Sequence, residues 1–225
     1  MTKRNKIHQP PAVTVDIVIF TIENKELRVL LIKRANEPFK GEAALPGGFL
    51  ARGETTQRAA LRILKDKAGV GDVYVEQLYT FDNPGRDPRG QVLTVTYFAL
   101  IPREQIKFEK GEKAQSPEFY SVKKLPNLAF DHGKIVEYAI GRLRAKIEYT
   151  NAAYSLLSEE FVFAELQRVY EAVLGRKLDK RNFRKKFMSL GLIKSTGKKL
   201  RGARQRPAEL YRFISRKPIE LIKFF

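Results

Sequence analysis

The sequence predicts an α/β protein in two parts: a mixed sheet sandwiched by helices, followed by a small module of short helices and a basic hairpin. Three observations support this. Strand-like runs dominate residues 12–100, helical spacing with glycine stop signals takes over near residue 150, and positive charge collects in the last third of the chain. We therefore expect one domain at 1–150 and another at 151–225.

The strands follow from short apolar runs that are bounded by turn residues. EAALPGGFL (42–50) predicts a short strand that ends at Gly47 and Gly48, where we expect the chain to turn. The other predicted strands are AVTVDIVIFTI (12–22), ELRVLLIKR (26–34), YVEQLYTFDN (74–83) and QVLTVTYFALIP (91–102).

Two helices are predicted to cover the sheet. In the first, apolar residues recur at helical spacing between positions 59 and 64, and Gly69 supplies a stop signal. The second is the stretch GKIVEYAIGRLRAKIEYT (133–150), with Asp131 as its expected N-cap. Strands on both sides of the first helix and before the second indicate a mixed sheet with a helix on each face.

The last third has the element order of a winged helix-turn-helix. A helix from about Ala164 to Leu174 is stopped by Gly175, and a second helix is capped by Asp179 and stopped by Gly191. Two short strand-like pieces then flank a long connection that is rich in Gly and Arg.

The charge of this module predicts a polyanionic partner. Residues 151–225 hold 18 Lys or Arg against 7 Asp or Glu, so they carry +11 of the chain's net +18. A basic block with hydrophobic periodicity is typical of a folded nucleic-acid-binding module, and we expect double-stranded DNA. Arg181 and Asn182 lie near the start of the second helix, where base edges are commonly read. The expected DNA contacts are Lys180, Arg181, Asn182, Arg184, Lys185, Lys198, Lys199, Arg201, Arg204 and Arg206.

Composition excludes several kinds of chemistry. The chain has no cysteine, which removes disulfides, thiolate nucleophiles and Cys-based zinc sites. Its two histidines, His8 and His132, are too few for a His-rich metal centre. No apolar run reaches the length of a membrane span or a signal-peptide core. We expect a cytoplasmic protein with no membrane partner, no cofactor, no bound metal and no catalytic residue.

One stretch, GGFLARGETTQRAALRILKDKAGV (47–70), carries a specific motif. After Gly48 come five residues and Glu54, then seven residues and Arg62, and the stretch closes with Gly69 and an apolar residue. This spacing resembles a Nudix box. In active Nudix hydrolases, carboxylates at i, i+3 and i+4 of the helix share one face and gather magnesium beside a diphosphate.

The carboxylates of this motif are largely lost here. Their positions hold Ile63, Asp66 and Lys67, that is, a hydrocarbon, a shortened carboxylate and a cation. Glu54 is retained, and it either supports the loop or caps the following helix. A site that keeps the frame and loses the metal cluster is expected to bind a nucleotide sugar without hydrolysing it.

The rest of the chain narrows the resemblance. With LAFDH (128–132) and FAELQRVYEAVLGRKLDKRNFRKK (163–186), residues 12–213 resemble the Nudix-related transcriptional regulators of the NrtR type. The resemblance implies a Nudix-like effector domain, a winged-helix DNA-binding domain and a homodimer on a palindromic operator. It also implies repression of genes of NAD metabolism, with ADP-ribose or a related nucleotide sugar as effector.

Two alternatives stay open. Related regulators with similarly eroded boxes sense sugars such as arabinose, so the effector could be a plain sugar. The chain could also be a weak ADP-ribose pyrophosphatase that retains metal through Asp66 and Glu54.

The loop GRDPRG (85–90) supplies the expected anion-binding side chains. Arg86 and Arg89 flank Asp87 between two strands, and their guanidinium forks suit a diphosphate, although a solvent-exposed turn is the alternative. His132, at a helix start, is expected to make a structural hydrogen bond. The expected ligand-binding residues are Gly47, Gly48, Glu54, Arg62, Arg86 and Arg89.

Overall fold

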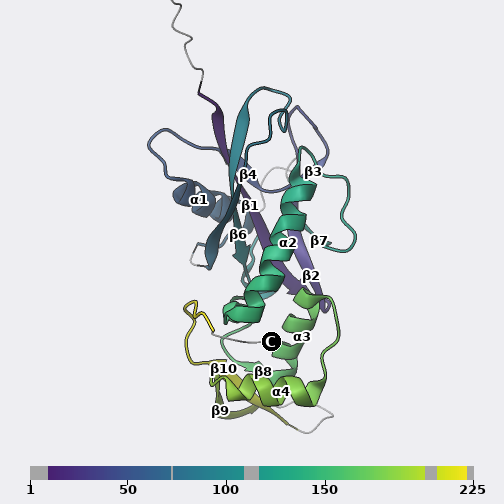
Figure 1. The fold of residues 1–225 in the computed structure, drawn as a ribbon, viewed down its shortest axis with the longest axis vertical. Helices are drawn as coiled ribbons and strands as arrows, with labels where there is room; N and C mark the ends of the chain where they lie inside the picture. Colours follow the sequence, from purple (N-terminus) through teal and green to yellow (C-terminus); the bar gives the residue numbers. More distant parts are fainter. Residues whose placement is uncertain (1–9, 72, 109–116, 201–206, 222–225) are drawn as a thin grey trace, which may run out of the picture.

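The computed structural model describes residues 10–71, 73–108, 117–200 and 207–221 (Figure 1). Within these residues, a mixed sheet of seven strands forms one end of the molecule and a three-stranded sheet lies at the other. In the large sheet, β1 (Ala12–Glu23) runs parallel to β6 (Val92–Leu100) and antiparallel to β2 (Glu26–Lys33). The other strands of this sheet are β3 (Ala43–Ala44), β4 (Gly47–Phe49), β5 (Val75–Phe81) and β7 (Pro117–Ser121).

Helices cover both faces of the large sheet. The helix α1 (Thr56–Ala68) lies on one side and α2 (His132–Tyr149) on the other (Figure 1). Side chains alternate along a strand, so Ile17 of β1 packs into the apolar cluster under α1 and Val18 packs into the cluster under α2. The predicted mixed sheet sandwiched by helices is confirmed.

The last third folds as the predicted winged helix-turn-helix. Gly175 ends the first helix with φ +71°, and the Asp179 side chain accepts a hydrogen bond from the Asn182 N–H at the start of the second. The elements are β8 (Phe161–Val162), α3 (Phe163–Leu174), α4 (Lys180–Ser189), β9 (Ile193–Leu200) and β10 (Ala208–Phe213).

One apolar core joins the two parts across residue 150. The cluster under α2 contains Leu143 of α2, Tyr154 of the connecting 3₁₀ helix, Leu166 of α3 and Phe187 of α4. In addition, the Arg144 Nε of α2 donates a hydrogen bond of 3.0 Å to a backbone carbonyl near the end of α3. The winged module is therefore packed against the sheet domain rather than tethered to it. None of the helices in the described part of the chain is long and apolar enough to cross a bilayer.

The prediction that the chain turns at Gly47 and Gly48 is wrong. Both glycines lie in β4, which pairs antiparallel with β1, so that Gly47 is opposite Asp16. A Cβ atom on Gly47 would lie 1.9 Å from an Asp16 carboxylate oxygen, whereas one on Gly48 would meet nothing within 4 Å. Gly47 is required by the close approach of the Asp16 side chain, not by a turn.

The structure contains two strands that the sequence did not predict, and it decides between the two roles considered for Glu54. The strands β7 and β8 were not expected from the sequence, because each is short and depends on partners far along the chain. Glu54 does not cap α1: the side chain of Thr55 does so by accepting a hydrogen bond of 3.2 Å from the Arg58 N–H.

Candidate functional site

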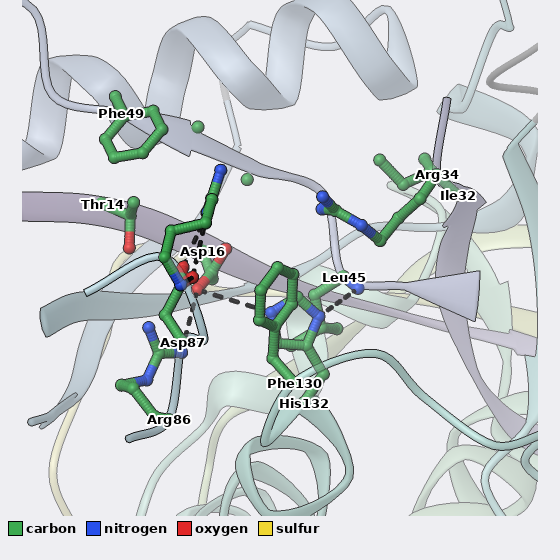
Figure 2. Close-up of a pocket in the computed structure, with 13 residues that line it drawn as sticks. Thr14, Asp16, Ile32, Arg34, Leu45, Phe49, Arg86, Asp87, Phe130 and His132 are labelled. Atoms are coloured by element: carbon green, nitrogen blue, oxygen red, sulfur yellow. Dashed lines mark hydrogen bonds and ion pairs between the residues drawn. The ribbon is translucent and has the colours of Figure 1, made fainter. Parts of the chain in front are cut away.

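A polar pocket opens where β1, β4, the β5–β6 loop and the start of α2 meet (Figure 2). Its cavity volume is about 130 Å³, below the range of roughly 300–1,000 Å³ that is typical of small-molecule sites. Four of the six predicted ligand residues line it: Gly47, Gly48, Arg86 and Arg89. The other lining residues are Thr14, Asp16, Ile32, Arg34, Leu45, Phe49, Asp87, Phe130 and His132.

Glu54 and Arg62, the other two predicted ligand residues, do not line this pocket and pair with each other. Arg62 donates to both oxygens of Glu54, at 2.8 and 2.9 Å, and Glu54 also accepts from the Ala51 N–H at 3.1 Å. The hydrogen bonds from Arg62, and then the bond from Ala51, lower the pKa of Glu54 to about 2. The pair of Glu54 and Arg62 stabilises the conformation of the loop between β4 and α1.

Arg86 is held by the protein itself. Its Nε and Nη2 donate to the two oxygens of Asp131, at 3.0 and 2.7 Å, and its side chain is only 4% exposed. Asp131 occupies the N-cap position of α2 as predicted, but its side chain makes no capping hydrogen bond because its carboxylate accepts from Arg86. The Arg86 fork thus ties the β5–β6 loop to the start of α2.

Arg89 lies at the mouth of the pocket. It donates to both oxygens of Asp87, at 2.9 and 2.6 Å, and these bonds are the main reason that the pKa of Asp87 is lowered. The Arg89 side chain is 41% exposed, and its guanidinium carbon is 5.2 Å from the ring centroid of Phe49 and 5.6 Å from that of Phe130. The outer side of this cation remains open to a ligand.

Arg34 was missed by sequence reasoning. It donates to the backbone carbonyls of Pro38 and Asn36, at 2.8 and 3.3 Å, and lies 4.6 Å from the ring centroid of Phe130. Burial, followed by the nearby Arg89 cation, lowers its pKa. Among the described residues, the guanidinium group of Arg34 pairs with no carboxylate. Its positive charge is therefore more available to an anionic ligand than the charge of Arg86. Its position just after β2 gives no sequence signal for this role.

Asp16 and His132 form the floor of the pocket (Figure 2). The Nδ1 of His132 accepts a hydrogen bond of 2.9 Å from the Leu45 N–H, which confirms its expected structural bond. Burial lowers the pKa of His132, so the ring is neutral and carries its proton on Nε2, 3.8 Å from the buried Asp16 carboxylate. Asp16 could have been identified as a site residue from the sequence, because it is a carboxylate in the middle of an apolar strand.

The altered positions of the motif helix differ in burial. Ile63 is 3% exposed and packs into the apolar cluster between α1 and the sheet. Asp66 is exposed and Lys67 is partly buried. Among the residues that the structure describes, no group of three or more His, Cys, Asp or Glu side chains is arranged to hold a metal ion. Replacing the first carboxylate position by Ile63 therefore extends the core of the domain.

The predicted DNA contacts lie on α4 and on the wing, which is the hairpin of β9 and β10. Phe183 and Phe187 are buried, while Lys180, Arg181, Asn182, Arg184 and Lys185 are exposed along α4. Lys198 and Lys199 are exposed on β9. The remaining predicted contacts, Arg201, Arg204 and Arg206, lie outside the described residues.

The fold and the pocket define a class of protein, a Nudix-type ligand-binding domain joined to a winged-helix DNA-binding module. Family models agree with this division. Residues 10–139 match the NUDIX domain and residues 153–213 match the NrtR DNA-binding winged helix domain. The chain belongs to the NrtR family of Nudix-related transcriptional regulators.

Three relatives are similar to this chain: a transcriptional repressor, an ADP-ribose pyrophosphatase and an NrtR of known structure. The chain is 39% identical over 208 residues to the ADPR responsive transcriptional repressor NtrR of Acinetobacter baylyi, covering 90% of this chain and 82% of the relative. It is 39% identical over 135 residues to an ADP-ribose pyrophosphatase of Methanocaldococcus jannaschii, covering 60% of this chain and 76% of the relative.

Solved structures of the third relative, Shewanella oneidensis NrtR, are also similar. Its complex with a 27mer DNA gives a TM-score of 0.83 and 36% identity, covering 95% of this chain and 99% of that one. Its NUDIX domain complexed with ADP ribose gives a TM-score of 0.54 and 36% identity, covering 64% and 99%.

Proposed function

We propose that the protein is an ADP-ribose-responsive repressor of genes of NAD metabolism that acts in the cytoplasm as a homodimer on a palindromic operator. Residues 1–150 form its effector domain and residues 151–225 its DNA-binding domain. The observation that carries the proposal is a pocket lined by Arg34, Arg89 and a buried Asp16, in a chain that also contains a winged helix. The similarity to a repressor over 90% of the chain supports it.

The pocket chemistry suits a nucleotide sugar. Arg34 and the open side of Arg89 supply positive charge for a diphosphate, because guanidinium groups form strong charge-assisted hydrogen bonds with phosphate oxygens. The Asp16 carboxylate is an acceptor for sugar hydroxyl groups. Phe49, whose side chain is among the exposed large apolar groups at 51%, offers a ring at the mouth on which a base can stack.

Binding without hydrolysis follows from the altered helix. A magnesium-dependent mechanism needs several carboxylates around the metal. Ile63 is buried, Lys67 adds a cation, and Asp66 retains one carboxylate. The ligand then acts as a signal rather than a substrate.

DNA is bound by α4 and the wing. Arg181 and Asn182 in the first turn are the proposed base-reading residues, because Arg pairs with guanine and Asn with adenine in the major groove. Lys180, Lys185, Lys198 and Lys199 are the proposed phosphate contacts, with Arg201, Arg204 and Arg206 continuing them along the chain.

Calorimetric titration with ADP-ribose tests the effector assignment. We expect binding by the wild-type protein and a loss of about 10- to 100-fold in affinity for Arg34→Ala and for Arg89→Ala, since a hydrogen bond to a charged group contributes about 1.5–3 kcal/mol. Arg58→Ala on the exposed side of α1 is the control for charge removal.

Saturating ADP-ribose is also expected to weaken binding to the operator in gel-shift titrations. Arabinose binding without ADP-ribose binding would instead identify a sugar-responsive regulator.

A weak ADP-ribose pyrophosphatase is the second candidate function. The observation that favours it is the 39% identity to such an enzyme over 135 residues. Magnesium-dependent turnover of ADP-ribose at about 1 per second or faster, abolished by Asp66→Asn, would establish this activity. We expect no such turnover.

A further inference from the structure

The Arg184 side chain on α4 contacts other residues of the winged module. Its Nη2 donates a hydrogen bond of 2.7 Å to the hydroxyl of Tyr211 on β10. Its guanidinium carbon is 4.8 Å from the ring centroid of Phe163, at the start of α3, and 5.5 Å from that of Tyr211. One side chain of α4 thereby contacts both the preceding helix and the wing.

The hydrogen-bond chain continues into the wing. The Tyr211 hydroxyl donates to a carboxylate oxygen of Glu209 at 2.5 Å. Hydrogen bonds from Ser195 on β9 and from Tyr211, together with the Arg184 charge, lower the pKa of Glu209. The carboxylate thus links both wing strands. Tyr211 is only 3% exposed, so DNA cannot reach it without unfolding the wing.

The helix geometry separates Arg184 from the outward face of α4. Phe183 and Phe187 define the buried side. Arg181, Lys185 and Met188 follow at i, i+4 and i+7, which places them together on the opposite side of the helix. Arg184 lies on the flank between these two sides, toward β10. Its charge also compensates Glu209, a carboxylate that would otherwise repel DNA phosphates from the wing.

We infer that Arg184 is a positioning residue that fixes the angle between α4 and the wing through Tyr211 and Glu209, and that it does not read or contact DNA. The inference rests on the proposed DNA-binding function. A phosphate contact and a positioning contact make different predictions. Loss of a phosphate contact weakens all duplexes and lowers the salt slope of binding by about one unit. Loss of the fixed angle lowers specific affinity and leaves the salt slope unchanged.

A double-mutant cycle tests this with Arg184→Gln, Tyr211→Phe and the two combined. Dissociation constants are measured over a range of salt concentrations for a duplex selected by the wild-type protein from a random pool, and for an unrelated duplex. We expect each single change to weaken specific binding by about ten-fold and the combination to weaken it no further, because both remove the same hydrogen bond. Arg58→Gln controls for the loss of one positive charge.

Amide hydrogen exchange without DNA provides the second readout. We expect faster exchange in β9 and β10 in both single variants and not in Arg58→Gln. The inference is overturned if Arg184→Gln lowers the salt slope by about one unit while Tyr211→Phe binds like the wild type, or if neither change alters exchange in the wing. A wild-type protein that selects no duplex would refute the proposed function, while the exchange measurement would still decide the role of Arg184.

Discussion

At the residue scale, the partners of each arginine decide its role. The loop that contains Arg86 and Arg89 was expected to lie at a ligand site, and both side chains line the pocket. Each fork holds a carboxylate, but Arg86 is buried against Asp131, far along the chain, whereas Arg89 pairs with its neighbour Asp87 and is largely exposed. Arg34 could not be selected from the sequence, because its exposure to the pocket depends on the path of the chain after β2.

Arg86→Ala and Arg89→Ala should therefore differ in stability. Removing Arg86 leaves the carboxylates of Asp131 and Asp16 without their cation in a largely buried place, so we expect a loss of about 3–5 kcal/mol in the free energy of unfolding. Arg89 is far more exposed, and its removal should cost less than about 1 kcal/mol. Urea denaturation monitored by circular dichroism measures both. Equal losses would contradict the structural role given to Arg86.

His132 should make stability depend on pH. Burial lowers its pKa in the folded state, so the unfolded chain takes up a proton first as the pH falls. The stabilisation is fully present above the unfolded value of about 6.5 and is lost as the pH falls below it, with a slope of at most about 1.4 kcal/mol per pH unit. We expect His132→Asn to flatten the change between pH 7.5 and 5.5, measured by urea denaturation. His8→Asn is the control, and a variant with the wild-type slope would exclude His132 as the source.

At the element scale, the sequence predicted what depends on neighbouring residues. The helices α1, α3 and α4 lie where periodicity and stop signals placed them, since caps and spacing are local properties. The short strands β7 and β8 were missed because their pairing is set by distant partners. The same limit explains the wrong prediction of a turn at Gly47 and Gly48. The constraint on Gly47 comes from Asp16 on the neighbouring strand β1.

Gly47→Ala and Gly48→Ala form a matched pair that tests this constraint. A methyl group on Gly47 would overlap the Asp16 carboxylate, while one on Gly48 enters open space. We expect Gly47→Ala to cost about 1–3 kcal/mol of unfolding free energy, as other overpacked sites do, and Gly48→Ala to be nearly neutral. Thermal and urea unfolding of the two variants give the comparison. A neutral Gly47→Ala would show that Asp16 has room to move aside.

At the scale of the whole molecule, the apolar cluster that crosses residue 150 makes the two parts interdependent. The sequence predicted both parts and their order, but it did not predict that they share a core. The shared core brings Leu143 of α2 into one apolar cluster with side chains of α3 and α4. No local sequence pattern predicts such long-range packing.

We expect this shared core to produce a single unfolding transition. The chain has no cysteine, so Arg58→Cys on α1 and Lys185→Cys on α4 can each carry one environment-sensitive fluorophore. Urea titrations should give coincident midpoints for the two labels, because packing couples the domains. A winged module that melts at clearly lower urea than the label on α1 would indicate two independent units.

The helix α2 has one further consequence. Its start is held at the pocket by Asp131 and His132, and near its end Arg144 bonds to the backbone of α3. Eighteen residues form a stiff lever of about 27 Å. A tilt of about 3° at the pocket would swing the far end by about 1.4 Å over that length. A ligand that displaces the Arg86–Asp131 pair slightly can therefore change the orientation of the winged module. In a symmetric pair of chains, the displacements of the two winged modules add.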